Sequence, residues 1–190
     1  MPKPKILGLI CAAILAAGCS SLPRAWGENV GLQADLLGGY RASDHDIVDQ
    51  NPVVGFELVT SDPAFPVGYE LGGLYGSGQE DVPGGNLDVA FTEAYLGLRR
   101  AWPTGNGSLR PYVGAGAAWM KTANDLHTAG PTSEFNDRGA GAYVHGGVLW
   151  SPAGLSFGRG TEVLLGLDLR GVLGDDVSYG ELAFVLGFGR

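Results

Sequence analysis

The stretch Glu93-Ala94-Tyr95-Leu96-Gly97-Leu98-Arg99 decides how this chain folds. Ala94, Leu96 and Leu98 occupy every second position, and the residues between them are charged, aromatic or glycine. Successive side chains of a β-strand point to opposite faces, so a period of two predicts a strand with one apolar face and one polar face. No convincing helical period is found after the N-terminal segment.

The same alternation recurs along the rest of the chain, and clusters of Gly, Pro, Asn, Asp and Ser separate the segments. Strands are expected near residues 29–40, 52–60, 69–75, 93–99, 112–119, 142–150, 162–170 and 181–188. Each is close to the length of about 9–11 residues that crosses a bilayer at a tilt. The pattern predicts an all-β fold, an eight-stranded antiparallel up-and-down transmembrane β-barrel.

The connections between these strands alternate in length. The expected long, acidic loops are 41–51, 76–86 and 124–138, and the expected short links are 61–66 and 101–108. Long loops on one side and short turns on the other are typical of outer-membrane barrels. With a periplasmic N-terminus, the long loops emerge outside the cell. Two connections fit this rule poorly, because 151–161 is long for a turn and 174–178 is short for a loop.

Alternation alone does not say which face points inward, and a soluble lipocalin-like barrel has the same period. Glycine decides for the membrane, because it falls repeatedly on the polar face. The glycines concerned are Gly31, Gly55, Gly72, Gly97, Gly114, Gly116, Gly147, Gly166 and Gly187. Glycine weakens an exposed strand, whereas inside a narrow eight-stranded barrel it makes room for large side chains.

The polar face also carries isolated charges of both signs, which we expect to pair across a small lumen. The predicted lumen network consists of Glu57, Glu70, Glu93, Arg99, His145, Asp168, Arg170 and Glu181. Unpaired charges in such a place would be costly, so a structural plug is the favoured interpretation, and a gate or proton path is the alternative. Aromatic residues near the strand ends predict the two interfacial girdles: Tyr69, Tyr75, Trp119, Trp150 and Phe188.

The N-terminus has the features of an export signal. Two lysines precede an apolar run over residues 6–17, which is too short for a spanning helix of about 20 residues. Residues 15–19 resemble a lipobox, so we expect a lipoprotein-type signal peptide over 1–18 and acylation of Cys19. An ordinary signal peptide, with Cys19 a bystander, is the alternative. Residues 19–28 are then a tether, and 29–190 form the outer-membrane barrel.

Composition narrows the classes of partner. The formal net charge of −8 falls to −10 without Lys3 and Lys5, and Lys121 is then the only lysine left. Nucleic-acid binding requires a basic surface, so no nucleic-acid partner is expected. Both cysteines, Cys11 and Cys19, precede the predicted barrel, which therefore has no disulfide and no cysteine metal ligand.

Three motifs resemble the small eight-stranded outer-membrane barrels of the OmpA/OmpX type: Glu93–Arg99, Arg110–Gly116 and the closing segment Phe184–Arg190. The closing segment is similar to the C-terminal signal that the barrel-assembly machinery reads, although Phe188 stands two places before the end. The resemblance implies a monomer in contact with outer-membrane lipid and lipopolysaccharide. Members of the family range from anchors and adhesion or resistance factors to a few lipid-modifying enzymes.

No catalytic residues are predicted. Lipid A deacylases of the PagL type resemble this barrel, but their His-x-Ser-Asn motif is absent, since Gly146-Gly147 follows His145. Asp44, His45, Asp46 and Asp49 offer oxygen and imidazole ligands in the first loop, yet they lack the EF-hand spacing. No metal site and no cofactor are therefore assigned, and solvated loops are the favoured interpretation.

These observations predict a non-enzymatic envelope protein that acts in surface structure, adhesion or resistance through its extracellular loops. Three alternatives stay open at this point. They are a narrow pore for ions or small solutes, a lipid-anchored lipocalin-like carrier, and a lipid A-modifying enzyme.

Overall fold

The computed structural model describes residues 31–43, 51–62, 65–83, 85–102, 104–105, 108–128, 133–152, 155–157, 161–174 and 178–189. The signal peptide, the tether and Cys19 lie outside these residues. So do Asp44, His45, Asp46 and Asp49 of the first loop. Within the described chain, no helix is long and apolar enough to span a membrane.

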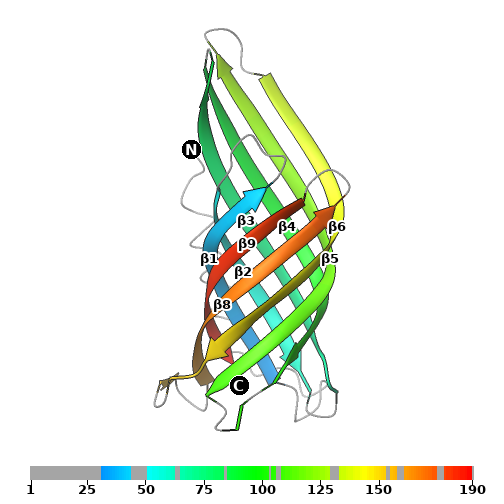
Figure 1. Ribbon diagram of the computed structural model, residues 1–190, viewed down its shortest axis with the longest axis vertical. Coiled ribbons are helices and arrows are strands. Elements are labelled where there is room, and N and C mark those ends of the chain that lie inside the picture. The colour runs from blue at the N-terminus through cyan, green and yellow to red at the C-terminus, as the bar shows by residue number, and fades with distance from the viewer. Residues whose placement is uncertain are drawn as a thin grey trace.

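The described chain forms a closed antiparallel barrel (Figure 1). Its strands are β1 (Gly31–Ser43), β2 (Asn51–Ser61), β3 (Gly68–Val82), β4 (Gly85–Ala101), β5 (Leu109–Thr128), β6 (Ser133–Trp150), β7 (Ser156–Phe157), β8 (Thr161–Gly174) and β9 (Ser178–Gly189). Each long strand pairs with its neighbours in sequence, β9 pairs with β1, and β6 pairs with β8, which closes the ring. The prediction of an eight-stranded up-and-down barrel is confirmed, and β7 is a two-residue addition paired with the start of β8.

The two faces of the wall point as the glycine pattern predicted. Large apolar residues such as Leu71, Leu98 and Phe184 are exposed on the outside. Charged residues of the same strands, among them Glu70 and Arg99, are buried inside. This is the reverse of a lipocalin, whose apolar face surrounds a ligand, so the lipocalin-like alternative is wrong. A wall with this much exposed apolar surface requires a lipid environment.

The exposed aromatic residues lie toward both ends of the wall. Tyr69 and Trp150 lie near the short turns. Tyr75 and Trp119 lie toward the opposite end, and each has a cross-strand partner on β4. All four side chains are exposed on the outer face. Their positions fit the two interfacial girdles of a membrane barrel.

Two of the predicted loops are in fact strands. Residues 76–86 continue the β3–β4 ladder up to the pair Val82 and Gly85, and most of 124–138 belongs to the β5–β6 ladder. The sequence hides these extensions because polar residues occupy both faces there, and the apolar alternation that marks a membrane-spanning strand is lost. The backbone ladder continues without it, since antiparallel pairing is closed at one tip by the tight turn after Val82.

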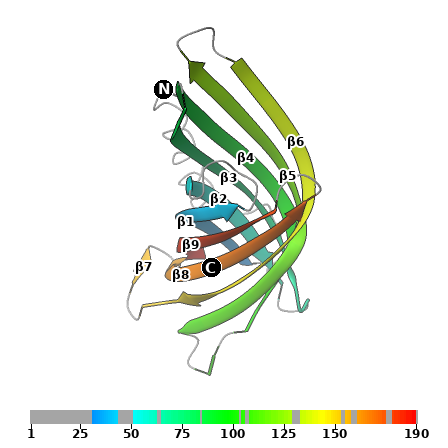
Figure 2. The same cartoon turned by 45° about the horizontal axis from the view of Figure 1, so that its top comes forward.

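Strands β3 to β6 therefore rise together beyond the rest of the barrel as a protruding sheet (Figures 1 and 2). These strands have 15, 17, 20 and 18 residues, whereas β1, β2, β8 and β9 have 13, 11, 14 and 12. The paired register of β2 with β3 ends at Gly76, and that of β6 with β8 ends at Gly141. Beyond these points β3 and β6 are the two edges of the protruding sheet.

Glycines of the inner face lie beneath aromatic side chains of neighbouring strands. A Cβ atom on Gly72 would meet the ring of Tyr95, and one on Gly97 would meet the hydroxyl of Tyr143. Gly72 and Tyr95 are direct cross-strand partners. At these two positions the predicted meaning is confirmed, because the missing side chain leaves the space that a lumen tyrosine fills. Other inner-face glycines make room for different side chains, such as Leu149 beside Gly166.

Replacing Gly97 with Ala should destabilise the barrel, because the new methyl group would also press on the backbone of Ala115. Overpacking of this kind costs about 1–3 kcal/mol. Gly171 is the matched control, since nothing lies within 4 Å of a Cβ placed there. Urea unfolding in lipid vesicles should show a lower midpoint for Gly97→Ala and little change for Gly171→Ala. Equal midpoints would contradict this account.

Candidate functional site

The eight residues predicted to form the lumen network all lie inside the barrel. They come from six strands: Glu57 on β2, Glu70 on β3, Glu93 and Arg99 on β4, His145 on β6, Asp168 and Arg170 on β8, and Glu181 on β9. None of them is more than 6% exposed. The structure therefore brings together, at the centre of the fold, residues that are separated by more than a hundred positions in the chain.

Arg99 of β4 connects two acidic residues on β1 and β2. Its Nη1 atom lies 2.6 Å from Oε1 of Glu57 and 3.3 Å from Oδ2 of Asp35. The hydroxyl of Tyr95 donates to the other oxygen of Glu57 at 2.9 Å, and the side-chain amide of Gln33 donates to Asp35. One cation is thus shared by two carboxylates, and neutral donors contact oxygens of both, as is usual for buried polar groups.

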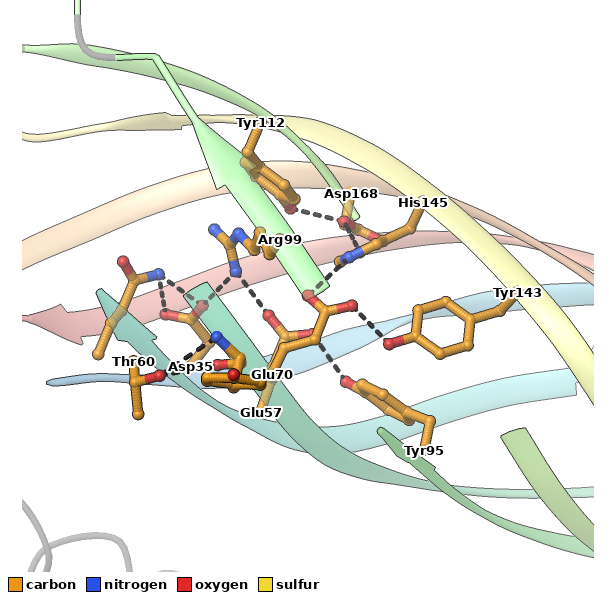
Figure 3. A network of polar contacts seen from close by, with 12 residues as sticks. Asp35, Glu57, Thr60, Glu70, Tyr95, Arg99, Tyr112, Tyr143, His145 and Asp168 are labelled. Atoms are coloured by element: carbon orange, nitrogen blue, oxygen red, sulfur yellow. Dashed lines mark hydrogen bonds and ion pairs between the residues drawn. The ribbon is translucent and has the colours of Figure 1, made fainter. Parts of the chain in front are cut away.

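His145 joins a second pair of acidic residues (Figure 3). Its Nδ1 atom lies 2.9 Å from Oδ2 of Asp168, and its Nε2 atom lies 3.0 Å from Oε2 of Glu70. The hydroxyl of Tyr112 donates to Asp168 at 2.6 Å, and that of Tyr143 donates to Glu70 at 2.5 Å. Because ionised carboxylates only accept hydrogen bonds, both contacts are satisfied when each ring nitrogen carries a hydrogen.

The third group of charges lies nearer the protruding sheet. Arg170 is 3.1 Å from Oε1 of Glu93, whose other oxygen accepts a hydrogen bond from the hydroxyl of Tyr179. Glu181 is the cross-strand partner of both Arg170 and Arg41. Cations and carboxylates thus alternate here as they do around Arg99 and His145.

Each of the three lumen arginines also stacks on aromatic rings. The guanidinium carbon of Arg99 lies 3.7 Å from the ring centroid of Tyr112. Arg41 lies between Phe91 and Tyr179, at 4.2 and 4.1 Å. Arg170 lies 3.7 Å from the ring of Tyr95. A guanidinium group over a ring face gains about 2 kcal/mol or more when the pair is desolvated, so these rings help to hold the charges in place.

The described lumen contains more acid than base. Its buried ionisable residues include six carboxylates, three arginines and one histidine: Asp35, Glu57, Glu70, Glu93, Asp168 and Glu181, with Arg41, Arg99, Arg170 and His145. Six acidic side chains therefore share four basic ones. Chemically, this arrangement can crosslink the wall, and it can accept further positive charge.

Sequence reasoning missed two members of the network, Asp35 and Arg41 of β1. Leu32 lies on the apolar outer face of this strand. Asp35 and Arg41 each stand an odd number of positions after it, so the alternation places both on the lumen face. Their partners could not be foreseen, because Asp35 meets Arg99 across the lumen and not along a strand. The tyrosines were placed on the polar face, but their hydrogen bonds depend on the register of distant strands.

Comparison with known proteins supports the fold only. No protein-family model matches the sequence, and no curated protein sequence matches it. Among solved structures, Ail, the attachment invasion locus protein of Yersinia pestis, has 13% sequence identity and a TM-score of 0.56, and the match covers 85% of this chain and 97% of Ail. The outer membrane protein OprG from Pseudomonas aeruginosa has 15% identity and a TM-score of 0.57, with 85% and 94% covered. Neisserial surface protein A has 15% identity and a TM-score of 0.50, with 83% and 95% covered.

Removing the cation from one of these charge groups should weaken the barrel. Arg99→Ala leaves Glu57 and Asp35 buried without their shared partner, and breaking such a buried pair costs about 3–5 kcal/mol. Heat-modified gel mobility and urea unfolding should both show an earlier transition. The adjacent Arg100, exposed on the outer face, is the control, and Arg100→Ala should change little. An unchanged transition in Arg99→Ala would rule out the structural role.

Proposed function

We propose that this chain is a non-enzymatic outer-membrane protein whose protruding sheet is a contact surface for molecules outside the cell. The observation that carries the proposal is the extension of β3 to β6 beyond the apolar part of the barrel (Figure 2). The sequence predicted a role for extracellular loops. The surface proposed here is instead a four-stranded sheet, which is a more rigid platform than a set of loops.

The protruding sheet has features of a docking surface. Its outward-facing residues on β3 are polar and exposed, including Ser77, Gln79 and Asp81. The parts of β3 beyond Gly76 and of β6 before Gly141 form edges without a paired strand among the described residues. An exposed edge can accept a strand from another protein, with affinity from the main chain and specificity from alternate side chains.

The names of the similar structures agree with a role at the cell surface. Ail is named for attachment and invasion, and the Neisserial protein is named as a surface protein. These names belong to those proteins, and the low identity transfers the fold alone.

The lumen supports the non-enzymatic interpretation. Both ring nitrogens of His145 contact carboxylates, and not the serine or cysteine nucleophile that acyl transfer would require. The filled network also disfavours the narrow-pore alternative, because Glu70 and Asp35, near its centre, are 0% and 1% exposed.

Lipopolysaccharide is the lipid partner that we propose for the outer face. Lys121 and Arg138 are direct cross-strand partners and both are exposed on the outside. They lie two positions beyond the aligned pair Trp119 and Ala140, at the aromatic girdle. Like charges placed opposite each other on a sheet destabilise it, and a lipid phosphate between the two side chains would relieve that repulsion.

Shortening the protruding sheet should abolish contact with external partners and leave the barrel intact. The variant removes 79–88 and joins Gly78 to Val89, which are cross-strand partners, through Asn-Gly. Cells displaying it should lose most of their attachment to immobilised extracellular-matrix proteins. The control, Arg100→Ala, lies on the outer face at the opposite end of the wall and should retain attachment. Wild-type attachment by the shortened variant, with normal heat-modified mobility, would contradict the proposal.

Replacing both Lys121 and Arg138 with Ala should remove the stabilisation that lipopolysaccharide provides. Wild-type protein should unfold at higher urea in vesicles that contain lipopolysaccharide than in vesicles of phospholipid alone. The double variant should show a much smaller difference between the two kinds of vesicle. Arg100→Ala, at the opposite end of the wall, is the control. The same lipopolysaccharide effect in wild type and double variant would argue against phosphate binding here.

A further inference from the structure

Three ligand atoms from different strands converge in the lumen. One carboxylate oxygen each from Glu57 and Glu70 and one ring nitrogen of His145 lie within 4.8 Å of one another. All three residues are buried, at 3%, 0% and 4% exposure. A histidine nitrogen with two carboxylate oxygens is a ligand set found in zinc and related transition-metal sites.

The histidine is oriented as a metal ligand would be. Asp168 holds Nδ1 of His145 at 2.9 Å, and Tyr112 in turn donates to Asp168 at 2.6 Å. This fixes a hydrogen on Nδ1 and directs Nε2 toward Glu70, as Figure 3 shows. Metal-binding histidines usually donate their other ring N–H to a carboxylate, which sets the tautomer and the ring orientation.

The two carboxylates are also supported from behind. Tyr95 and Arg99 each bond one oxygen of Glu57, and Tyr143 donates to Oε1 of Glu70. Each carboxylate oxygen has two acceptor positions, so these contacts leave capacity for a metal ion. Hydrogen bonds to ligating carboxylates are typical of protein metal sites.

A glycine allows the histidine and the carboxylate to approach each other. A Cβ atom on Gly114 would collide with the His145 ring and lie 2.9 Å from Oε1 of Glu70. Position 114 therefore admits the imidazole next to Glu70 because it has no side chain.

The charge balance points to a cation. Glu57, Glu70, Asp35 and Asp168 lie in this part of the lumen with Arg99 and His145, and Arg170 stacks on the ring of Tyr143 beside them. Burying several carboxylates with too few cations is unfavourable. A divalent ion supplies the missing positive charge at the point where two of these carboxylates approach each other.

We propose that the lumen binds one divalent first-row transition-metal ion, such as Zn²⁺, through His145 Nε2, Glu57 and Glu70. On binding, the ion replaces the hydrogen on Nε2, which leaves as a proton, and Nδ1 keeps its hydrogen bond to Asp168. The nitrogen ligand selects against Mg²⁺ and Ca²⁺, which prefer oxygen ligands throughout. The ion ties β6 to β2 and β3 across the barrel.

Co²⁺ is a suitable probe because tetrahedral coordination gives it intense visible absorption. The chain has three histidines, so His45→Ala with His127→Ala leaves His145 as the only imidazole and removes the exposed His127–Asp88 pair. This background protein, refolded in detergent with Co²⁺ and passed through a desalting column, should retain one equivalent with that spectrum. Added Zn²⁺ should displace it.

Ligand variants then test the assignment. Glu57→Gln and Glu70→Gln should abolish the absorption, and Asp168→Asn, a positioning change, should weaken binding by about 10–100-fold. Glu93→Gln, a lumen control bonded to Arg170, should bind normally. Heat-modified mobility shows which variants are folded. Failure of the folded background protein to retain Co²⁺, or full retention by folded Glu70→Gln, would overturn the proposal.

Discussion

The pairing of buried charges across the lumen is the interaction on which the rest of this structure depends. A carboxylate such as Glu57 is stabilised inside the barrel because Arg99 reaches it from β4, two strands away. That contact requires the intervening strands to be in correct register and the wall to be curved. The outer face supplies no comparable specificity, because its apolar side chains meet lipid, which accepts any register. The polar interior therefore defines which barrel forms.

The packing of side chains inside the lumen follows from the same need to pair buried charges. A guanidinium group and an imidazole need neighbours that are flat and able to donate or stack, and tyrosine meets both needs. Tyr112, for example, donates to Asp168 and supports Arg99 with its ring. An eight-stranded barrel has little internal volume, so each ring requires a missing side chain beside it. The glycines and tyrosines are thus two parts of one packing solution, and neither is explained without the other.

This division explains how far sequence reasoning could go. Period-two alternation located eight strands, because the membrane imposes a strict contrast between the two sides of the wall, and the glycines of the polar face then showed which side points inward. It failed at residues 76–86 and 124–138, where the contrast between an apolar and a polar face disappears from the sequence. It also identified most charges of the lumen but not their partners, since the meeting of Glu70 with His145 depends on the curvature of the whole ring.

The barrel therefore has two regions along its axis, one that stabilises the fold and one that is free to vary. Within the membrane, the lumen side chains hold the barrel together, so a substitution there changes its stability first. Beyond the membrane, β3 to β6 continue without that constraint, so their side chains can vary while the backbone ladder still holds the sheet upright. A metal ion at His145 would strengthen this separation, because it would fix β6 to β2 and β3 near the base of the protruding sheet. A platform that contacts external molecules transmits force to its base, and a crosslink among three of the strands resists that force better than hydrogen bonds along the wall alone.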